Sequence, residues 1–243
     1  MRAHSVLTEK IRDHCNRLLR RVDDLKRLMV AAEKLAKEDL HRWQFLTREA
    51  RGAAVVGVMA ELEALTKFAI QETHRAINAS TLTHKELRKC MRQLAAHDAF
   101  ESLRAVQDHS KLWSTRSFTT TLEGCADLLA LPIPSKGPQP PLDGKTLKPE
   151  HFNRLWLVYG LPDVAFPSAS WSSALQKMAL IRNDVAHGNM PFTDIFSQAG
   201  RTTSEIEGYI DDVSSFAIHF VEQWCEYLDK EQYLSSRVAE IDA

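Results

Sequence analysis

The polar cluster that follows the apolar run LQKMALI combines an arginine with a histidine. Arg182, Asn183 and His187 stand in the sequence RNDVAHG. Arginine offers a planar set of donors that suits an anion such as phosphate, and histidine is the side chain best able to move protons near neutral pH. These residue types suit a phosphodiester whose charge is held while a hydroxyl is deprotonated. The neighbouring sequence supplies no second proton-transfer group, but a dimer that places two copies of the cluster face to face would.

The residues around the cluster predict a helix that ends beside it. Gly188 stands where a helix end favours a residue that adopts positive φ, and Pro191 prevents the helix from continuing. Asn183 and His187 are four residues apart and share a helix face, whereas Arg182 diverges from His187 by about 140°. Arg182 and His187 can therefore converge on one anion if the last turn opens. The preceding apolar face comprises Leu175, Met178, Ala179, Leu180 and Val185.

An ordinary helix terminus explains the same residue types without any chemistry. Basic side chains are favoured in the last turn because they complement the helix dipole, typically by about 0.3 to 1 kcal/mol. Asparagine, aspartate and glycine are also common at helix ends. Spacing and composition alone therefore leave two interpretations open, a catalytic site and a helix cap.

The composition is that of a globular protein without a strong charge preference. The chain has 243 residues, of which 44% are hydrophobic and 26% are charged, and its formal net charge is −1. Nucleic-acid binding would therefore rely on a local basic patch. The N-terminal sequence lacks the apolar core of a signal peptide, and no run reaches the roughly 18 to 20 apolar residues that cross a membrane. These features predict a soluble cytoplasmic protein with no membrane partner.

No metal or cofactor motif accompanies the cluster. Cys15, Cys90, Cys125 and Cys225 are widely spaced without a CxxC pair, which argues against a zinc site or a disulfide framework. The sequence also lacks a phosphate-binding glycine loop, an HExxH motif and a GxSxG motif. We therefore expect no metal and no cofactor.

Hydrophobic periodicity predicts helices along most of the chain. Residues 5–40 contain no glycine or proline, and their apolar positions alternate spacings of three and four, as in a long helix packed along a narrow seam. Such a helix lies inside a bundle or, alternatively, pairs with a second chain as a coiled coil. Further helices are expected at 47–78, 83–96, 97–108, 119–130, 149–158, 171–187 and 203–228. Strand signals are almost absent, so the predicted fold class is all-α, an up-and-down helical bundle.

A proline-rich stretch interrupts the helices. The first 131 residues contain no proline, whereas residues 132–149 contain six. This density excludes a helix or a central strand, and we expect a long loop within one helical domain rather than a domain linker. Residues 1–243 are thus predicted to form a single domain. Its parts are a long N-terminal helix (1–44), central helices (45–131), the proline-rich loop (132–149), and the motif and C-terminal helices (150–243).

The cluster resembles the Arg-x4–6-His motif of the HEPN domain family. RNDVAHG, within LIRNDVAHGN, has the RNxxAHG form of that motif. The wider layout is also similar, with a long helix containing LEALTKFAI, a variable middle, WLVYGLP, the motif helix and a last helix beginning near SEIEGYI. The resemblance covers about residues 45 to 230. It is closest to HEPN groups found in prokaryotic conflict and defence systems, the RiboL-PSP group among them.

The resemblance implies a metal-independent endoribonuclease that acts as a homodimer and leaves a 2′,3′-cyclic phosphate. His187 would activate the RNA 2′-hydroxyl or protonate the leaving 5′-oxygen. Arg182 would hold the scissile phosphate, and Asn183 would orient the phosphate or the histidine. The other implied site residues are Asp184 and Gly188 within the motif, Glu63 as an acidic partner of the motif arginine, and Lys177 and Arg201 as local RNA-binding residues.

The implied biological role is that of a toxin or antiphage effector that cleaves host or phage RNA. An antitoxin or another defence-system protein would be a further partner. A non-catalytic HEPN scaffold for dimerisation or partner binding is the alternative, because the slightly acidic net charge departs from the basic groove usual in an RNA enzyme. A third interpretation is a helical regulatory or antitoxin-like protein in which RNDVAHG only ends a helix.

Overall fold

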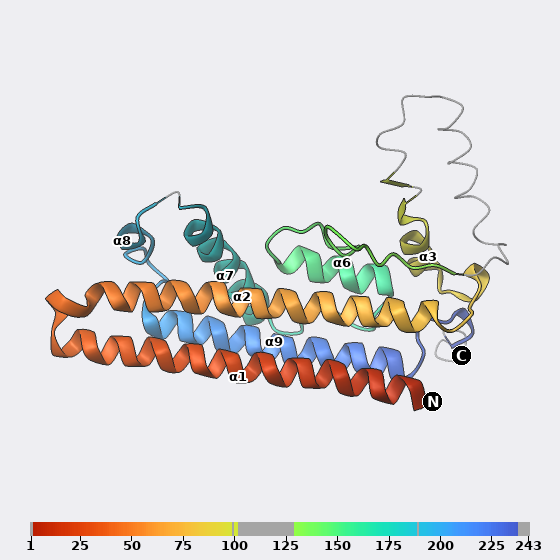
Figure 1. Cartoon of the computed structure of the whole chain (residues 1–243), viewed down its shortest axis with the longest axis horizontal. Coiled ribbons are helices and arrows are strands. Elements are labelled where there is room, and N and C mark those ends of the chain that lie inside the picture. Colours follow the sequence, from red (N-terminus) through yellow and green to blue (C-terminus); the bar gives the residue numbers. More distant parts are fainter. Residues whose placement is uncertain (1, 99, 102–128, 189, 238–243) are drawn as a thin grey trace, which may run out of the picture.

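Figure 1 shows the computed structural model of the chain, in which three long helices lie side by side and shorter helices line one side of them. The structure describes residues 2–98, 100–101, 129–188 and 190–237. The helices expected at 97–108 and 119–130 lie largely outside these residues. Within the described ranges every named element is helical, and the only strand-like pairing is an isolated antiparallel bridge between Leu87 and Leu234. The prediction of an all-α helical bundle is confirmed.

The long helices are α1 (Arg2–Glu38), α2 (Leu40–Asn78) and α9 (Thr203–Asp229). Helices α1 and α2 form an antiparallel hairpin, and α9 runs beside them in the direction of α2 (Figure 1). The apolar seam of α1 is buried against these two helices, so the bundle interpretation of the first helix is confirmed and its seam is not free for a coiled coil. The buried seam residues are Ile11, Cys15, Leu18, Val22, Leu25, Met29, Ala32 and Ala36.

The shorter helices α3 (Lys89–Ala95), α6 (Pro149–Tyr159), α7 (Ala169–His187) and α8 (Phe192–Ile195) lie along α2 on the side away from α1 (Figure 1). Helix α7 packs against both α2 and α9. Aromatic rings join α6 to α9, where Phe152 meets Phe216 edge to face with 4.6 Å between ring centroids. This packing fixes where α6 and α7 lie relative to each other above the long helices.

Two of the helices differ from those predicted by more than three residues. Helix α2 begins at Leu40 rather than near residue 47, because Asp39 caps it by accepting a hydrogen bond from the Arg42 backbone N–H at 3.1 Å. The helix expected over 83–96 is wrong as a single element. Its Thr83 capping box is present, but it begins only the short 3₁₀ helix η1 (His84–Glu86), after which the chain straightens before α3.

The proline-rich loop is not helical, and α6 begins at its last proline, Pro149. The start of the loop is held by Asn78 of α2, whose amide nitrogen donates to the Leu131 carbonyl at 2.9 Å and whose oxygen accepts the Leu131 N–H at 2.7 Å. Buried Gln139 then donates to the Pro132 carbonyl at 2.9 Å. These hydrogen bonds therefore hold the loop in place against the helices.

We expect the protein to lose stability in acid because His74 of α2 is buried. Its Nδ1–H donates to the Pro132 carbonyl at 2.7 Å, which leaves Nε2 to accept the Tyr159 hydroxyl at 2.6 Å. Burial lowers the pKa of His74 to about 4, although the Pro132 carbonyl acts in the opposite direction. Between pH 6.5 and 4 the unfolded chain therefore binds the extra proton, and acid favours unfolding.

We expect the free energy of unfolding to fall by about 3 kcal/mol from this group as pH drops from 7 to 4. Urea unfolding at several pH values measures this change. The variant His74→Gln should lack that part of the pH dependence, whatever its stability at pH 7. An identical pH dependence in the variant and the wild type would show that His74 is not the group responsible.

Candidate functional site

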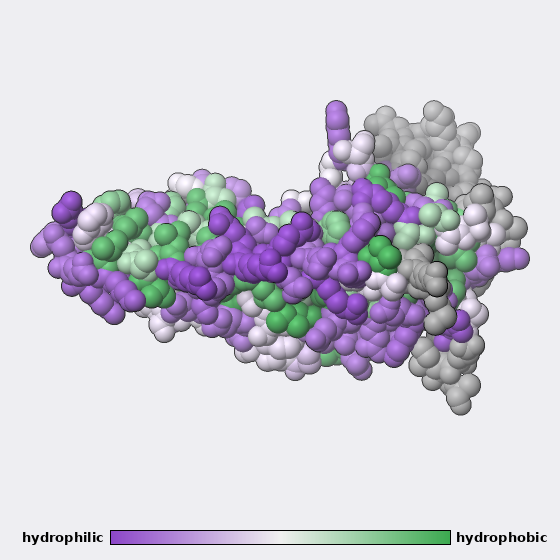
Figure 2. All heavy atoms as spheres, turned by 60° about the horizontal axis from the view of Figure 1, so that its bottom comes forward, coloured by the Kyte–Doolittle hydropathy of each residue, from purple (hydrophilic) through white to green (hydrophobic). Residues whose placement is uncertain are grey.

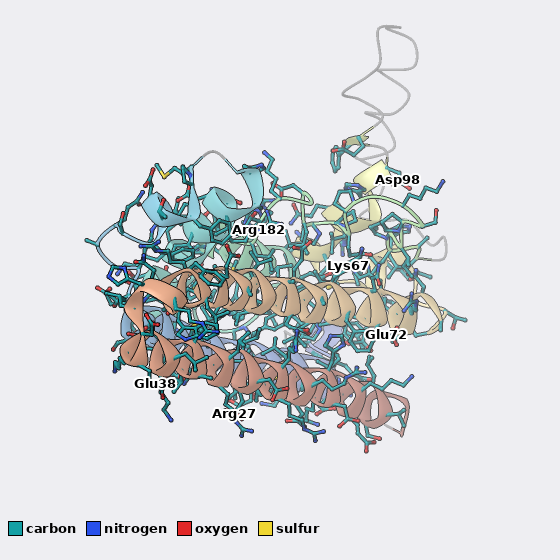
Figure 3. The ribbon with its side chains drawn as sticks, turned by 60° about the vertical axis from the view of Figure 1, so that its left-hand side comes forward. Arg27, Glu38, Lys67, Glu72, Asp98 and Arg182 are labelled. Atoms are coloured by element: carbon teal, nitrogen blue, oxygen red, sulfur yellow. The ribbon has the colours of Figure 1, made fainter. Side chains whose placement is uncertain are left out.

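The end of α7 lines an open hollow of about 470 Å³ opposite the proline-rich loop and the start of α6. Arg182, Asn183 and His187 all reach it, and Arg182 lies on the side of α2 away from α1 (Figure 3). Helix α7 continues through His187, and Gly188 ends it with a φ of 61°, as predicted. The last turn does not need to open for the three side chains to share one hollow. The remaining lining residues are Asp143, Gly144, Lys145, Thr146, Lys148, Glu150, His151 and Arg154.

Asn183 is held by a contact between α7 and the loop. The Thr146 hydroxyl donates to Asn183 Oδ1 at 2.6 Å, and Arg182 Nη1 approaches the same oxygen at 3.5 Å. Thr146 itself is buried. The amide oxygen of Asn183 is thus occupied within the chain, whereas its nitrogen donates no hydrogen bond to the described residues.

The side chains of His187 and Arg182 are accessible to a ligand in the hollow. The His187 side chain is exposed and makes no hydrogen bond among the described residues. Arg182 is half-buried, and no carboxylate of the described chain forms an ion pair with it. Glu63 is half-buried on α2 and does not pair with Arg182 in the structure. An anion that enters the hollow would therefore meet an uncompensated guanidinium and an accessible imidazole.

Positive charge is in excess around the hollow. Its lining includes the cations of Lys145, Lys148, Arg154 and Arg182 but only the carboxylates of Asp143 and Glu150. A slightly acidic protein therefore carries a basic hollow beside its motif.

Asp143 is already engaged by its neighbours in the loop. Burial raises its pKa, but hydrogen bonds from the Lys145 backbone N–H and from His151 outweigh this and hold the pKa below its ordinary value. His151 Nδ1 accepts the Lys148 backbone N–H at 3.1 Å, so its Nε2–H is the donor to Asp143, also at 3.1 Å. Both ring nitrogens of this buried histidine are thus used to shape the loop.

Three of the five predicted site residues that do not line the hollow contact other parts of the chain instead. Arg201 forms a 2.7 Å ion pair with Asp184 and donates to the Ile195 carbonyl at 3.2 Å, so its nearly buried guanidinium ties α7 to the segment before α9. Lys177 extends over the Tyr209 ring of α9, 4.8 Å from the ring centroid. Lys177, Asp184 and Arg201 therefore stabilise the placement of α7 instead of lining the hollow.

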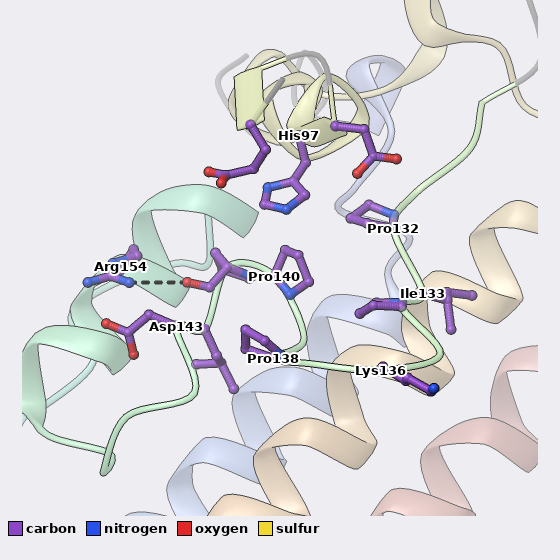
Figure 4. A pocket seen from close by; sticks show the side chains of 13 residues that line it. His97, Pro132, Ile133, Lys136, Pro138, Pro140, Asp143 and Arg154 are labelled. Atoms are coloured by element: carbon purple, nitrogen blue, oxygen red, sulfur yellow. Dashed lines mark hydrogen bonds between the residues drawn. The ribbon is translucent and has the colours of Figure 1, made fainter. Parts of the chain in front are cut away.

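A second hollow of about 670 Å³ is also lined by the proline-rich loop (Figure 4). Prolines of the loop form much of its wall, and His97 faces them. Arg154 and Asp143 line both hollows, and Arg154 Nη1 donates to the Pro141 carbonyl at 3.1 Å. Residues of the loop thus line both hollows, and Arg154 of α6 supports the loop.

Sequence reasoning missed the contribution of the loop to the site. Lys145, Thr146 and Lys148 stand in the sequence GKTLKPEH. Its two lysines just before a helix start were the signal that could have indicated an anion-binding loop. Arg154 follows one turn into α6. Their closeness to Arg182 depends on long-range packing of α6 and α7, which no local pattern reveals. Across the described ranges, no group of three or more metal-ligating side chains could hold an ion.

Comparison with known proteins identifies the family. The chain matches the family model described as RiboL-PSP-HEPN over residues 16–226. The match includes most of α1, so the expectation that the resemblance starts near residue 45 was too narrow. No curated protein and no solved structure matches the chain. None of the described helices is long and apolar enough to cross a membrane. The chain belongs to the RiboL-PSP-HEPN family.

Proposed function

We propose that this protein is a metal-independent endoribonuclease whose active site combines two copies of the Arg182–Asn183–His187 cluster across a homodimer. One His187 takes the proton of an RNA 2′-hydroxyl, whose oxygen attacks the adjacent phosphorus. The bond from phosphorus to the 5′-oxygen breaks, and the second His187 protonates that oxygen. Arg182 holds the negative charge of the phosphate throughout. The products are a 2′,3′-cyclic phosphate and a 5′-hydroxyl.

The observation that carries this proposal is the shared hollow at the end of α7. Arg182, Asn183 and His187 line it together, and cations outnumber carboxylates around them. A helix cap requires neither an accessible histidine nor further lysines from a distant loop. The combination of an anion clamp and an exposed proton-transfer group suits phosphodiester cleavage.

Two features support the need for a second copy. His151 is the other histidine of the hollow, but it is buried and both of its nitrogens are engaged, so it does not exchange protons with substrate. Leu180 is 48% exposed and lies seven residues before His187, on the same face of α7. Exposed Leu157 of α6 adds apolar surface beside Arg154. Apolar side chains next to the cluster suit burial in a dimer.

The proposed biological role is that of a toxin or antiphage effector, held inactive by an antitoxin or another defence-system protein until it is needed. The test of the activity is incubation of the purified protein with varied RNAs in EDTA. We expect cleavage that leaves 2′,3′-cyclic phosphate ends and is lost in both Arg182→Ala and His187→Ala. Persistent cleavage by both variants would exclude the proposed site, and intact RNA with the wild type would exclude the activity.

A non-catalytic scaffold is the second candidate function, favoured by one surface feature. Figure 2 shows a mostly hydrophilic face on which hydrophobic residues gather toward the end that holds the α1–α2 turn. Near this turn Leu40 is 62% exposed and Phe45 is 56% exposed. Exposed apolar groups of this kind suit a protein partner. If RNA stays intact, replacing Leu40 and Phe45 with serine should weaken capture of a co-expressed partner.

A further inference from the structure

The loop residue Thr146 forms a direct hydrogen bond with the motif residue Asn183. Its hydroxyl donates to Asn183 Oδ1 at 2.6 Å, which is at the short end for such bonds. Thr146 is only 9% exposed, so little of its side chain is in contact with water. The two residues are 37 positions apart in the chain, so the folded bundle alone brings them together.

Thr146 and Arg182 contact the same atom of the Asn183 amide, and the two contacts together fix which way the amide faces. An arginine side chain can only donate hydrogen bonds, and Arg182 Nη1 lies 3.5 Å from the same atom of Asn183 that Thr146 contacts. That atom is therefore the amide oxygen. The amide nitrogen carries two donors that find no acceptor among the described residues, and Asn183 lines the basic hollow. Both donors are thus left for a ligand in the hollow.

The backbone on both sides of Thr146 is held in place. The Lys145 N–H donates to Asp143 at 3.1 Å, and the Lys148 N–H donates to His151 Nδ1 at 3.1 Å. Leu147 is buried in the core between them. A hydroxyl presented by so constrained a segment has little freedom to leave Asn183, which is how a supporting residue pre-organises a site.

We propose that Thr146 is a positioning residue that orients Asn183, so that the amide N–H groups donate to a non-bridging oxygen of the scissile phosphate. This inference rests on the proposed ribonuclease function. The proline-rich loop then has a defined role, since it sets the geometry of the motif from outside the motif helix. Without the Thr146 hydroxyl, the amide can rotate and present its oxygen to the phosphate, which repels it.

The test compares Thr146→Val and Thr146→Ser with the wild type in RNA cleavage. Valine keeps the shape of threonine but loses the donor, so we expect kcat to fall about tenfold with little change in KM. Serine keeps the hydroxyl and should restore most of kcat. The matched control is Thr193→Val, which makes the same change at an exposed threonine of α8 that does not line the hollow and should leave kcat unchanged.

A double-mutant cycle with Asn183→Ala separates positioning from a general effect on the fold. If Thr146 acts through Asn183, Thr146→Val should cause no further loss of kcat in the Asn183→Ala background. Wild-type kcat in Thr146→Val, or an undiminished loss in that background, would overturn the inference while leaving the proposed function intact. Absence of cleavage by the wild type itself would overturn both.

Discussion

Replacing His187 with alanine is expected to slow RNA cleavage by about 10²- to 10⁴-fold, the usual contribution of a positioned acid–base group. The effect should lie at the upper end of this range. The substitution is present in both subunits, so it removes both the base and the acid of each composite site. His187 is exposed and makes no hydrogen bond among the described residues, so we expect stability to change by less than about 0.5 kcal/mol. Single-turnover cleavage and thermal unfolding measure the two quantities.

The matched control is His41→Ala, which removes an exposed histidine near the start of α2, at a position that does not line the hollow. It should cleave at the wild-type rate. RNA binding by His187→Ala should stay near that of the wild type, because the cations of Lys145, Lys148 and Arg182 remain. Cleavage at the wild-type rate by folded His187→Ala would remove this histidine from the mechanism.

Replacing Trp224 with alanine is expected to destabilise the protein by about 3 to 5 kcal/mol. This tryptophan of α9 is fully buried, and its indole N–H donates to Thr73 of α2 at 2.9 Å. Its ring lies 4.6 Å from the Tyr159 ring at the end of α6. The substitution leaves a large cavity where three helices meet and an unpaired Thr73 hydroxyl. Urea unfolding at neutral pH measures the loss.

Trp224→Phe provides the comparison, because it keeps an aromatic ring in the same place and loses the hydrogen bond to Thr73. We expect a smaller destabilisation of about 1 to 2 kcal/mol. Since α6 carries Arg154, loosening its contact with α9 should also weaken RNA binding in Trp224→Ala. Equal stabilities for Trp224→Ala and the wild type would show that this aromatic contact does not hold the bundle together.

Local patterns were sufficient where a helix is determined by its own sequence. The α1 seam runs without glycine or proline, so its apolar period alone placed the helix and its buried face correctly. The end of α7 followed from Gly188, which adopts the left-handed conformation that few other residues tolerate. The family resemblance likewise rested on contiguous residues, and RNDVAHG was enough to indicate it.

Long-range contacts decided what the sequence could not predict. The segment after Glu86 has the period of a helix, but the Arg88 N–H donates to the Tyr233 carbonyl at 2.8 Å and the chain straightens there. A tertiary bond thus outweighed local propensity. The contact of Thr146 with Asn183 has the same origin, because it joins a loop to a helix 37 residues later. The sequence predicted Arg201 as an RNA-binding residue, but in the fold its guanidinium forms an ion pair with Asp184.

The most direct test of the composite site is the cleavage rate per subunit in EDTA, measured across protein concentrations while sedimentation reports the fraction of dimer. Each active site is proposed to need His187 and Arg182 from two subunits. The rate per subunit should therefore fall in step with the dimer fraction as the protein is diluted. A monomer that cleaves RNA at the full rate, or a dimer that leaves every RNA intact, would contradict the account.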